Sequence, residues 1–272
     1  MTKQARNTGK QARRNSKQQR APRNELPGDS LQVPRAPFKR KAWAPLTDAQ
    51  ASLANAVNVY PITFVEGEFG TGKTFVPTAT AADRLIEDNE HRFVLTRPAV
   101  GAGEELGFFP GELEDKVLPW AQPVIDILNE RLGTSFVEYL LKTGRIEIAP
   151  LGMLRGRTFS NCTVLLDEAQ NTTPKQMKMF LSRIGEGTSM IVDGDLKQTD
   201  ITGPSGLADA VKRFKSHPQF GYVRFGIDDI VRSGIAKEVC LGYADEPRER
   251  DAPVTNPVPD FFNYSAQPLG NA

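Results

Sequence analysis

Short apolar runs alternate with segments of helical spacing along the middle of the chain. The runs predict strands at residues 61–65, 91–96, 146–149, 162–166, 189–192 and 221–225. Apolar positions three and four residues apart predict helices at 73–87, 113–142 (interrupted at Gly133), 174–184 (capped by Thr173) and 206–214. Strands that alternate with helices form parallel sheets covered on both faces, so we expect an α/β fold with a mainly parallel sheet.

The two ends of the chain differ from this middle part. Residues 1–42 are rich in Arg, Lys, Gln, Asn and Pro and poor in large apolar side chains, so we expect a disordered N-terminal arm. Residues 1–41 hold 12 basic and 2 acidic residues, which leaves 22 basic and 31 acidic residues for the rest. The arm would bind nucleic acid electrostatically, or it is a solvated tail that aids solubility. Residues 245–272 are expected to form a loose, Pro-rich tail, which leaves 43–244 as the folded domain.

Length and composition exclude several classes of protein. A chain of 272 residues and 30.0 kDa suits one domain with tails. It has no apolar run of 18 residues, so we expect no membrane-spanning helix, and no apolar stretch follows the N-terminal charges as in a secretory signal. Cys162 and Cys240 are too few for a disulfide framework or a four-ligand zinc site. We therefore expect a cytoplasmic protein without a membrane partner.

The strongest candidate site follows the first predicted strand. Its eight residues match the phosphate-loop pattern of Gly, four residues, Gly, Lys and Ser or Thr, and they are Gly67, Glu68, Phe69, Gly70, Thr71, Gly72, Lys73 and Thr74. The glycines let successive backbone N–H groups surround an anion, and the next helix adds its positive end. We expect this loop to bind ATP, with Lys73 at the β- and γ-phosphates and Thr74 on Mg²⁺.

Two later strands end in polar residues that complete such a site. Asp167 follows a buried strand and is expected to hold Mg²⁺, while Glu168 would polarise the attacking water. Asp195 and Gln198 follow the next strand, and the Gln198 amide would sense the γ-phosphate. The alternative for both segments is an ordinary polar turn. The phosphate loop about 95 residues upstream favours the catalytic interpretation.

The three segments discussed above follow one another as GEFGTGKT, LLDEAQ and DGDLKQ. Together, in this order, they resemble superfamily 1 helicase-type ATPases. Further blocks resemble the PhoH family of phosphate-starvation-type ATPases, and they lie at residues 96–100, 106–111, 149–151, 153–159, 171–174 and 177–181. The resemblance covers roughly residues 44–240. It implies a single RecA-like phosphate-loop NTPase core that hydrolyses ATP, and it implies an association with RNA unwinding and ring assembly.

The resemblance also implies roles for residues outside the phosphate loop. Gln50 would read the adenine edge, unless its segment is only a helix start capped by Thr47. Arg97 follows a strand end where helicase-like proteins touch the sugar-phosphate backbone. Candidate arginines for the γ-phosphate are Arg155, Arg157, Arg183 and Arg232; the alternative is surface ion pairing, which is favoured for Arg183 at the end of a helix. Arg232 is preferred as a finger that reaches a neighbouring subunit, whereas Arg155 and Arg157 would line a nucleic-acid path or the γ-phosphate site.

The sequence thus predicts a Mg²⁺-dependent ATPase that couples hydrolysis to binding or unwinding of RNA or single-stranded nucleic acid. One RecA-like core leaves half of the nucleotide exposed, so we expect a homo-oligomer, in the form of a ring such as a hexamer. The alternative is a nucleotide-dependent assembly switch or regulator without helicase activity.

Overall fold

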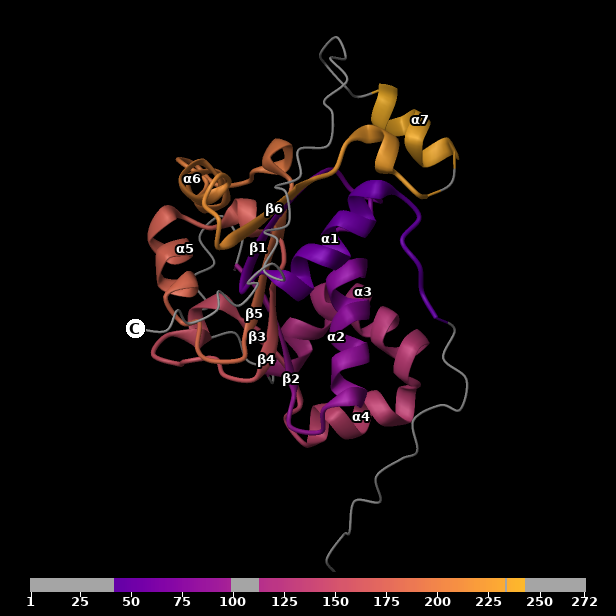
Figure 1. The fold of residues 1–272 in the computed structure, drawn as a ribbon, viewed down its shortest axis with the longest axis vertical. Coiled ribbons are helices and arrows are strands. Elements are labelled where there is room, and N and C mark those ends of the chain that lie inside the picture. Colours follow the sequence, from indigo (N-terminus) through magenta and orange to yellow (C-terminus); the bar gives the residue numbers. More distant parts are fainter. Residues whose placement is uncertain (1–41, 99–112, 233, 243–272) are drawn as a thin grey trace, which may run out of the picture. The chain divides into compact units, whose positions relative to one another are not determined.

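A parallel sheet with helices on both faces forms the folded part of the chain in this computed structural model, which describes residues 42–98, 113–232 and 234–242 (Figure 1). Within these residues the six strands make one sheet in the order β3-β2-β4-β5-β1-β6, and every neighbouring pair is parallel. The strands are β1 (Ile62–Glu66), β2 (Arg92–Arg97), β3 (Ile146–Pro150), β4 (Cys162–Leu166), β5 (Ser189–Gly194) and β6 (Phe220–Arg224). The predicted α/β fold with a parallel sheet is confirmed.

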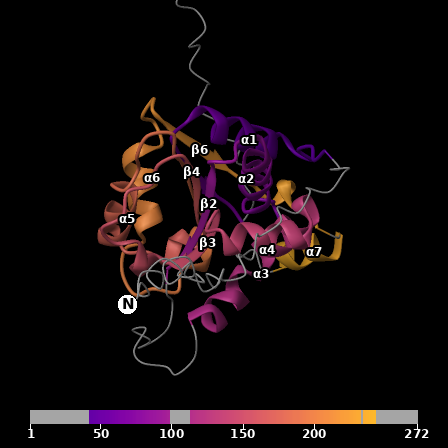
Figure 2. The same ribbon diagram turned by 90° about the horizontal axis from the view of Figure 1, so that it is seen from below.

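Alternate side chains of each strand enter two separate cores. Val65, Leu165 and Ile191 belong to the core on one face, and Phe64, Val164 and Met190 belong to the core on the other. The first face is covered by the helices α1 (Asp48–Val59), α2 (Phe75–Glu87), α3 (Leu113–Leu132) and α4 (Thr134–Lys142). The second face is covered by α5 (Pro174–Leu181) and α6 (Gly206–Phe214), as Figure 2 shows from below.

The sheet order determines where polar strand ends meet. β5 lies between β1, which leads into the phosphate loop, and β4, which ends before Asp167. In the register of the sheet, Val65 of β1 pairs with Asp193 of β5, and Leu166 of β4 pairs with Val192. The carboxyl ends of β1, β5 and β4 therefore lie side by side, at the edge where α/β proteins bind ligands.

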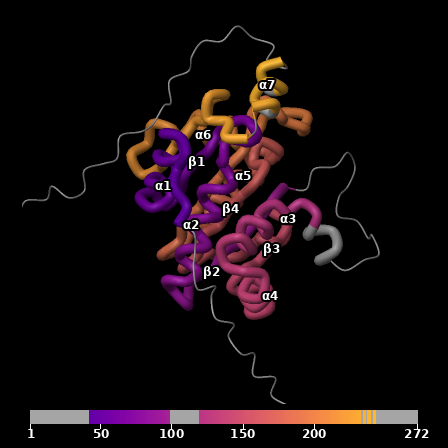
Figure 3. The backbone as a smooth tube through the Cα atoms, turned by 90° about the vertical axis from the view of Figure 1, so that its right-hand side faces the viewer, coloured from indigo at the N-terminus to yellow at the C-terminus, as the bar shows by residue number. Residues whose placement is uncertain are grey.

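Most helix bounds agree with the prediction, and the differences have local causes. The expected interruption at Gly133 is present, since this residue has φ = +80° and separates α3 from the adjacent α4 (Figure 3). α5 ends at Leu181, three residues earlier than predicted, because the following residues lie beside 159–161 and the Phe159 amide donates to the Arg183 carbonyl. The helix α7 (Gly234–Gly242) was not predicted.

Several predictions fall outside the described residues. They concern the basic arm, the Pro-rich tail and the block at 106–111, so the division into arm, domain and tail stays a prediction. In the described part of the chain, no helix is long and apolar enough to cross a membrane.

Candidate active site

The phosphate loop joins the end of β1 to the start of α2. Gly70 and Gly72 have φ = +77° and +90°, a left-handed conformation that glycine adopts without strain. The buried Thr71 hydroxyl donates to the Glu68 carbonyl at 2.9 Å, and Lys73 Nζ donates to the same carbonyl at 3.4 Å. The loop is thus closed on itself, with the Lys73 ammonium folded back over it.

Gln50 ties this loop to the start of α1. Its Nε2 donates to the Thr71 carbonyl at 2.8 Å, its Oε1 accepts from the Leu46 amide at 2.8 Å, and the side chain is buried. The Thr47 hydroxyl caps α1 by accepting from the Gln50 amide at 3.2 Å, so the capping role is present. The adenine contact stays a prediction, and both amide atoms of Gln50 are bound within the chain.

Two carboxylates and a hydroxyl meet where β4, β5 and the phosphate loop converge. Thr74 Oγ1 donates to Asp193 Oδ2 at 3.0 Å, although the two residues are 119 positions apart. Burial raises the pKa of Asp167. Burial, and then the charge of Asp167, raise the pKa of Asp193 well above its ordinary value. This is the electrostatic environment that a bound cation relieves.

The donor set of this cluster fits Mg²⁺. Asp193 is fully buried, and its Oδ1 has no hydrogen-bond donor among the described residues. A buried carboxylate oxygen without a donor costs free energy unless a proton or a cation is close. Thr74 and Asp167 supply the hard oxygen ligands that Mg²⁺ prefers, so the residues present agree with the predicted metal position.

Glu168 follows directly in an unusual backbone conformation. Its φ and ψ of 54° and 38° are left-handed, which is uncommon for a residue other than glycine and is typical of functional sites. Its Oε1 pairs with Arg97 Nη2 at 3.3 Å, and its Oε2 accepts from Gln170 Nε2 at 2.5 Å. The predicted base therefore lies at the same edge as Asp167 and is held by two partners.

Gln170 connects this acidic segment with the segment after β5. It is fully buried, and its Oε1 accepts from the Asp195 amide at 3.1 Å. Asp195 Oδ2 in turn accepts from Gln198 Nε2 at 2.8 Å, and the Gln198 side chain is exposed at the carboxyl edge of the sheet. The structure thus places the predicted sensor Gln198 at the same edge of the sheet as the predicted base.

Arg232 lies against the phosphate loop of its own chain. The Val231 amide donates to the Gly70 carbonyl at 3.0 Å, and a Cβ at Gly70 would meet Arg232 Cδ at 3.1 Å. The side chain is exposed beyond this contact. The structure thus places Arg232 beside the phosphate loop of its own chain, and its reach into a neighbouring subunit stays a prediction.

The other predicted arginines differ in whether they already form ion pairs within the chain. Arg157 forms a two-pronged ion pair with Glu147, in which Nη2 and Oε2 are 2.7 Å apart, and the guanidinium lies over the Phe159 ring. Arg155 is exposed after a short turn, and Arg97 is held by Glu168. Arg155 thus has the most accessible cation of the three. Arg97 and Arg157, whose side chains are 31% and 35% exposed, would each have to leave a carboxylate first.

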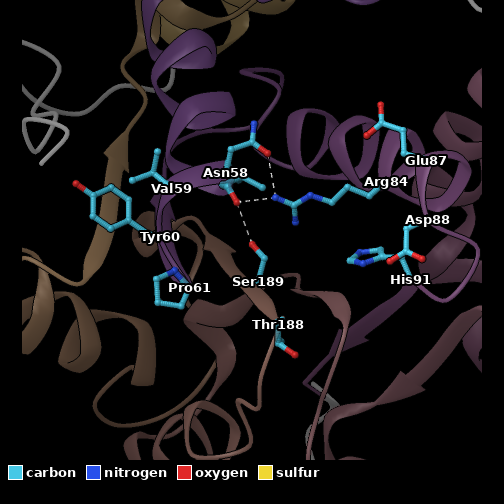
Figure 4. Close-up of a pocket in the computed structure, with 12 residues that line it drawn as sticks. Asn58, Val59, Tyr60, Pro61, Arg84, Glu87, Asp88, His91, Thr188 and Ser189 are labelled. Carbon is cyan, nitrogen blue, oxygen red and sulfur yellow. Dashed lines mark hydrogen bonds between the residues drawn. The ribbon is translucent and has the colours of Figure 1, made fainter. Parts of the chain in front are cut away.

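A separate hollow lies at the opposite edge of the sheet (Figure 4). Arg84 crosses it and donates to the Val57 carbonyl at 2.9 Å and to Asn58 Oδ1 at 3.0 Å. Ser189 donates to the same Val57 carbonyl at 3.1 Å, and the buried His91 bonds to Thr163. These polar groups hydrogen-bond to groups within the chain. We therefore interpret the hollow as a gap between packed elements and not as part of the candidate active site.

Residues 43–244 match the family model described as PhoH-like protein. The chain belongs to the PhoH family. Protein PhoH of Escherichia coli is 45% identical over 201 residues, which cover 72% of this PhoH-family chain and 57% of that protein. The PhoH-like protein of Synechocystis is 40% identical over 215 residues, with 78% and 64% covered. The chain thus spans less than two-thirds of either relative.

The solved structures that match this PhoH-family chain are more distant from it in sequence. A large terminase from a thermophilic bacteriophage has a TM-score of 0.42 and 12% identity, over 73% of this chain and 50% of that one. The Hef helicase domain of Pyrococcus furiosus has a TM-score of 0.38 and 11% identity, over 66% and 38%. Independently of these likenesses, the PhoH family and the phosphate loop on a parallel sheet indicate a nucleotide-binding protein of the P-loop NTPase class.

Sequence reasoning missed two residues of the site. Asp193 and Gln170 both stand inside the motifs that drew attention, yet neither received a role. The available signal was strand periodicity, since Asp193 has the parity of Ile191 and therefore belongs on the face covered by α2. That signal becomes informative only when β5 is known to lie between β1 and β4.

Proposed function

We propose that this PhoH-family protein binds ATP with Mg²⁺ and hydrolyses it. The observation that carries the proposal is the meeting of Thr74, Asp167 and Glu168 at one sheet edge, beside the phosphate loop. Thr74 and Asp167 would hold Mg²⁺, which shields the phosphate charges when bound.

The remaining groups suit the hydrolytic step itself. Glu168 orients and polarises a water and accepts its proton as the water oxygen attacks the γ-phosphorus. The bond from the γ-phosphorus to the oxygen shared with the β-phosphate breaks, and ADP leaves with that oxygen. Lys73 offsets the negative charge on the transferred group, and Gln198 hydrogen-bonds the γ-phosphate or the water. Arg232, whose side chain lies where a Cβ at Gly70 would meet it, adds a second cation beside the loop.

We further propose that hydrolysis is coupled to binding or unwinding of RNA or single-stranded nucleic acid. The support is the ion pair between Arg97 and Glu168, whose side chains are 31% and 32% exposed. A backbone phosphate that binds Arg97 competes with Glu168 for the guanidinium and leaves that carboxylate free to engage water. Nucleic acid would in this way stimulate turnover through a single contact, with Arg155 and the basic arm adding affinity.

The protein is proposed to act as a homo-oligomer in the form of a ring. The rim of the phosphate loop is exposed, with Phe69 40% accessible, so a neighbouring copy would cover the nucleotide and exclude water. Light scattering with ATP and Mg²⁺ tests this, since a strict monomer that still turns over ATP contradicts it. The second candidate is a nucleotide-dependent assembly switch, favoured by the closed, self-bonded form of the loop.

ATP turnover with and without single-stranded RNA or DNA distinguishes these functions. Replacing Glu168→Gln should lower turnover by about 10²–10⁴-fold and leave nucleotide affinity in place. The matched control is Glu186→Gln, the same chemical change at an exposed turn residue whose backbone carbonyl bonds to Asn161. Stimulation by nucleic acid that Glu168→Gln abolishes supports the motor. ATP turnover that does not change with nucleic acid favours the assembly switch. Full turnover in Glu168→Gln refutes the assignment of Glu168 as the base.

A further inference from the structure

Asp193 lies near the end of β5, between the strands that lead to Thr74 and to Asp167. It is the penultimate residue of β5 and pairs with Val65 of β1, while the residue before it pairs with Leu166, which directly precedes Asp167. Its parity places it on the face covered by α2, the helix that begins at the phosphate loop. Asp193 thus stands between the two residues predicted to hold Mg²⁺.

The contacts of Asp193 divide its two oxygens between two tasks. Oδ2 accepts the Thr74 hydroxyl proton at 3.0 Å, which leaves the lone pairs of Thr74 Oγ1 available as ligands. Oδ1 is fully buried and has no donor among the described residues. A carboxylate in this position orients a metal ligand and adds negative charge at the cation, as outer partners of metal sites do.

We propose that Asp193 is a positioning residue of the Mg²⁺ site, which orients the Thr74 hydroxyl and sets the affinity of the protein for the Mg²⁺–nucleotide complex. The proposal rests on the proposed function, because it assumes that the phosphate loop binds a nucleotide with Mg²⁺. Asp193 belongs to neither the phosphate loop nor the acidic strand end, so it adds a third segment, the end of β5, to the cation site.

The test measures Mg²⁺ dependence instead of turnover. A fluorescent ATP analogue is titrated into wild type and Asp193→Asn, first with a chelator and then at increasing Mg²⁺, and Mn²⁺ binding to the nucleotide complex is followed by electron paramagnetic resonance. Asp193→Asn keeps the shape of the side chain and places no charge in the buried site, so we expect it to fold. We expect unchanged affinity in chelator and about 10–100-fold more Mg²⁺ for the half-maximal effect.

Two comparisons separate positioning from general damage. The control Asp209→Asn makes the same change at a surface carboxylate of α6 that pairs with Arg213, and its Mg²⁺ midpoint should equal that of wild type. In a Thr74→Val background the effect of Asp193→Asn should shrink, because the hydroxyl that Asp193 orients is gone.

The outcomes distinguish a failure of the positioning role of Asp193 from a failure of the proposed binding of nucleotide with Mg²⁺. If wild type binds the analogue without any Mg²⁺ dependence, the proposed function fails. If wild type depends on Mg²⁺ and Asp193→Asn has the same midpoint, the positioning role of Asp193 is overturned. Equal losses of affinity in chelator and in Mg²⁺ also overturn it, since they indicate damage to the loop and not to the cation site.

Discussion

Replacing Gly72 by alanine tests how the phosphate loop is held before a nucleotide binds. Gly72 has φ = +90°, and a Cβ there would lie 2.7 Å from Gln50 Nε2. Left-handed backbone costs an L-residue about 1–2 kcal/mol. Gln50 must also move away, which breaks its 2.8 Å bond to the Thr71 carbonyl at a cost of about 0.5–1.5 kcal/mol. The free energy of unfolding should therefore fall by about 1.5–3.5 kcal/mol.

Two other glycines of the chain separate these contributions. Gly156 has φ = +78°, and a Cβ at this residue would have nothing within 4 Å, so Gly156→Ala carries only the backbone cost. Gly152 has open space as well and no positive φ, so Gly152→Ala should lose no stability. All three substitutions lower the conformational entropy of the unfolded chain by a similar amount. The differences in their unfolding free energies therefore report on the folded state. Urea unfolding without nucleotide measures the series.

A double-mutant cycle completes the test. In a Gln50→Ala background the Cβ no longer meets an amide, so Gly72→Ala should cost only as much as Gly156→Ala does in the wild-type chain. The reasoning is refuted if Gly72→Ala and Gly156→Ala cost the same in the wild-type chain and the cycle is additive. A Cβ at residue 72 would then leave the bond between Gln50 and the Thr71 carbonyl intact.

Three further predictions concern other parts of the molecule. Burial, and then Arg84, lower the pKa of His91, so stability is full above its ordinary pKa of about 6.5 and falls as the pH drops towards the lower folded-state pKa. His91→Asn should flatten the unfolding free energy between about pH 7.5 and 5, and an unchanged slope would contradict this. Arg232→Ala should lower turnover, and mixing it with Glu168→Gln should not restore activity if Arg232 serves its own chain; recovery would place it at a neighbour's site. Deleting residues 1–42 should flatten the salt dependence of RNA affinity, and an equal slope would reject the arm.

Much of the fold follows from local sequence patterns. β4 and α6 have the predicted bounds, 162–166 and 206–214, because a short apolar run between turns and an amphipathic spacing after a cap are local signals. The phosphate loop is also predictable from the sequence, because its glycines stand where the loop needs a positive φ, and Gly70 and Gly72 have that conformation. The break at Gly133 follows from one residue.

The tertiary structure decided which of these segments meet. Thr74 and Asp193 are 119 positions apart, and Arg97 ends β2 while Glu168 follows β4, so no local pattern pairs them. Their meeting depends on the strand order, which places β5 between β1 and β4 for the first pair and β2 beside β4 for the second. Periodicity tells which face a residue occupies, but long-range packing of the helices on both faces selects the neighbouring strand. The sequence by itself thus determined the elements and the phosphate loop, and the sheet order determined the partners of Asp193, Glu168 and Arg232.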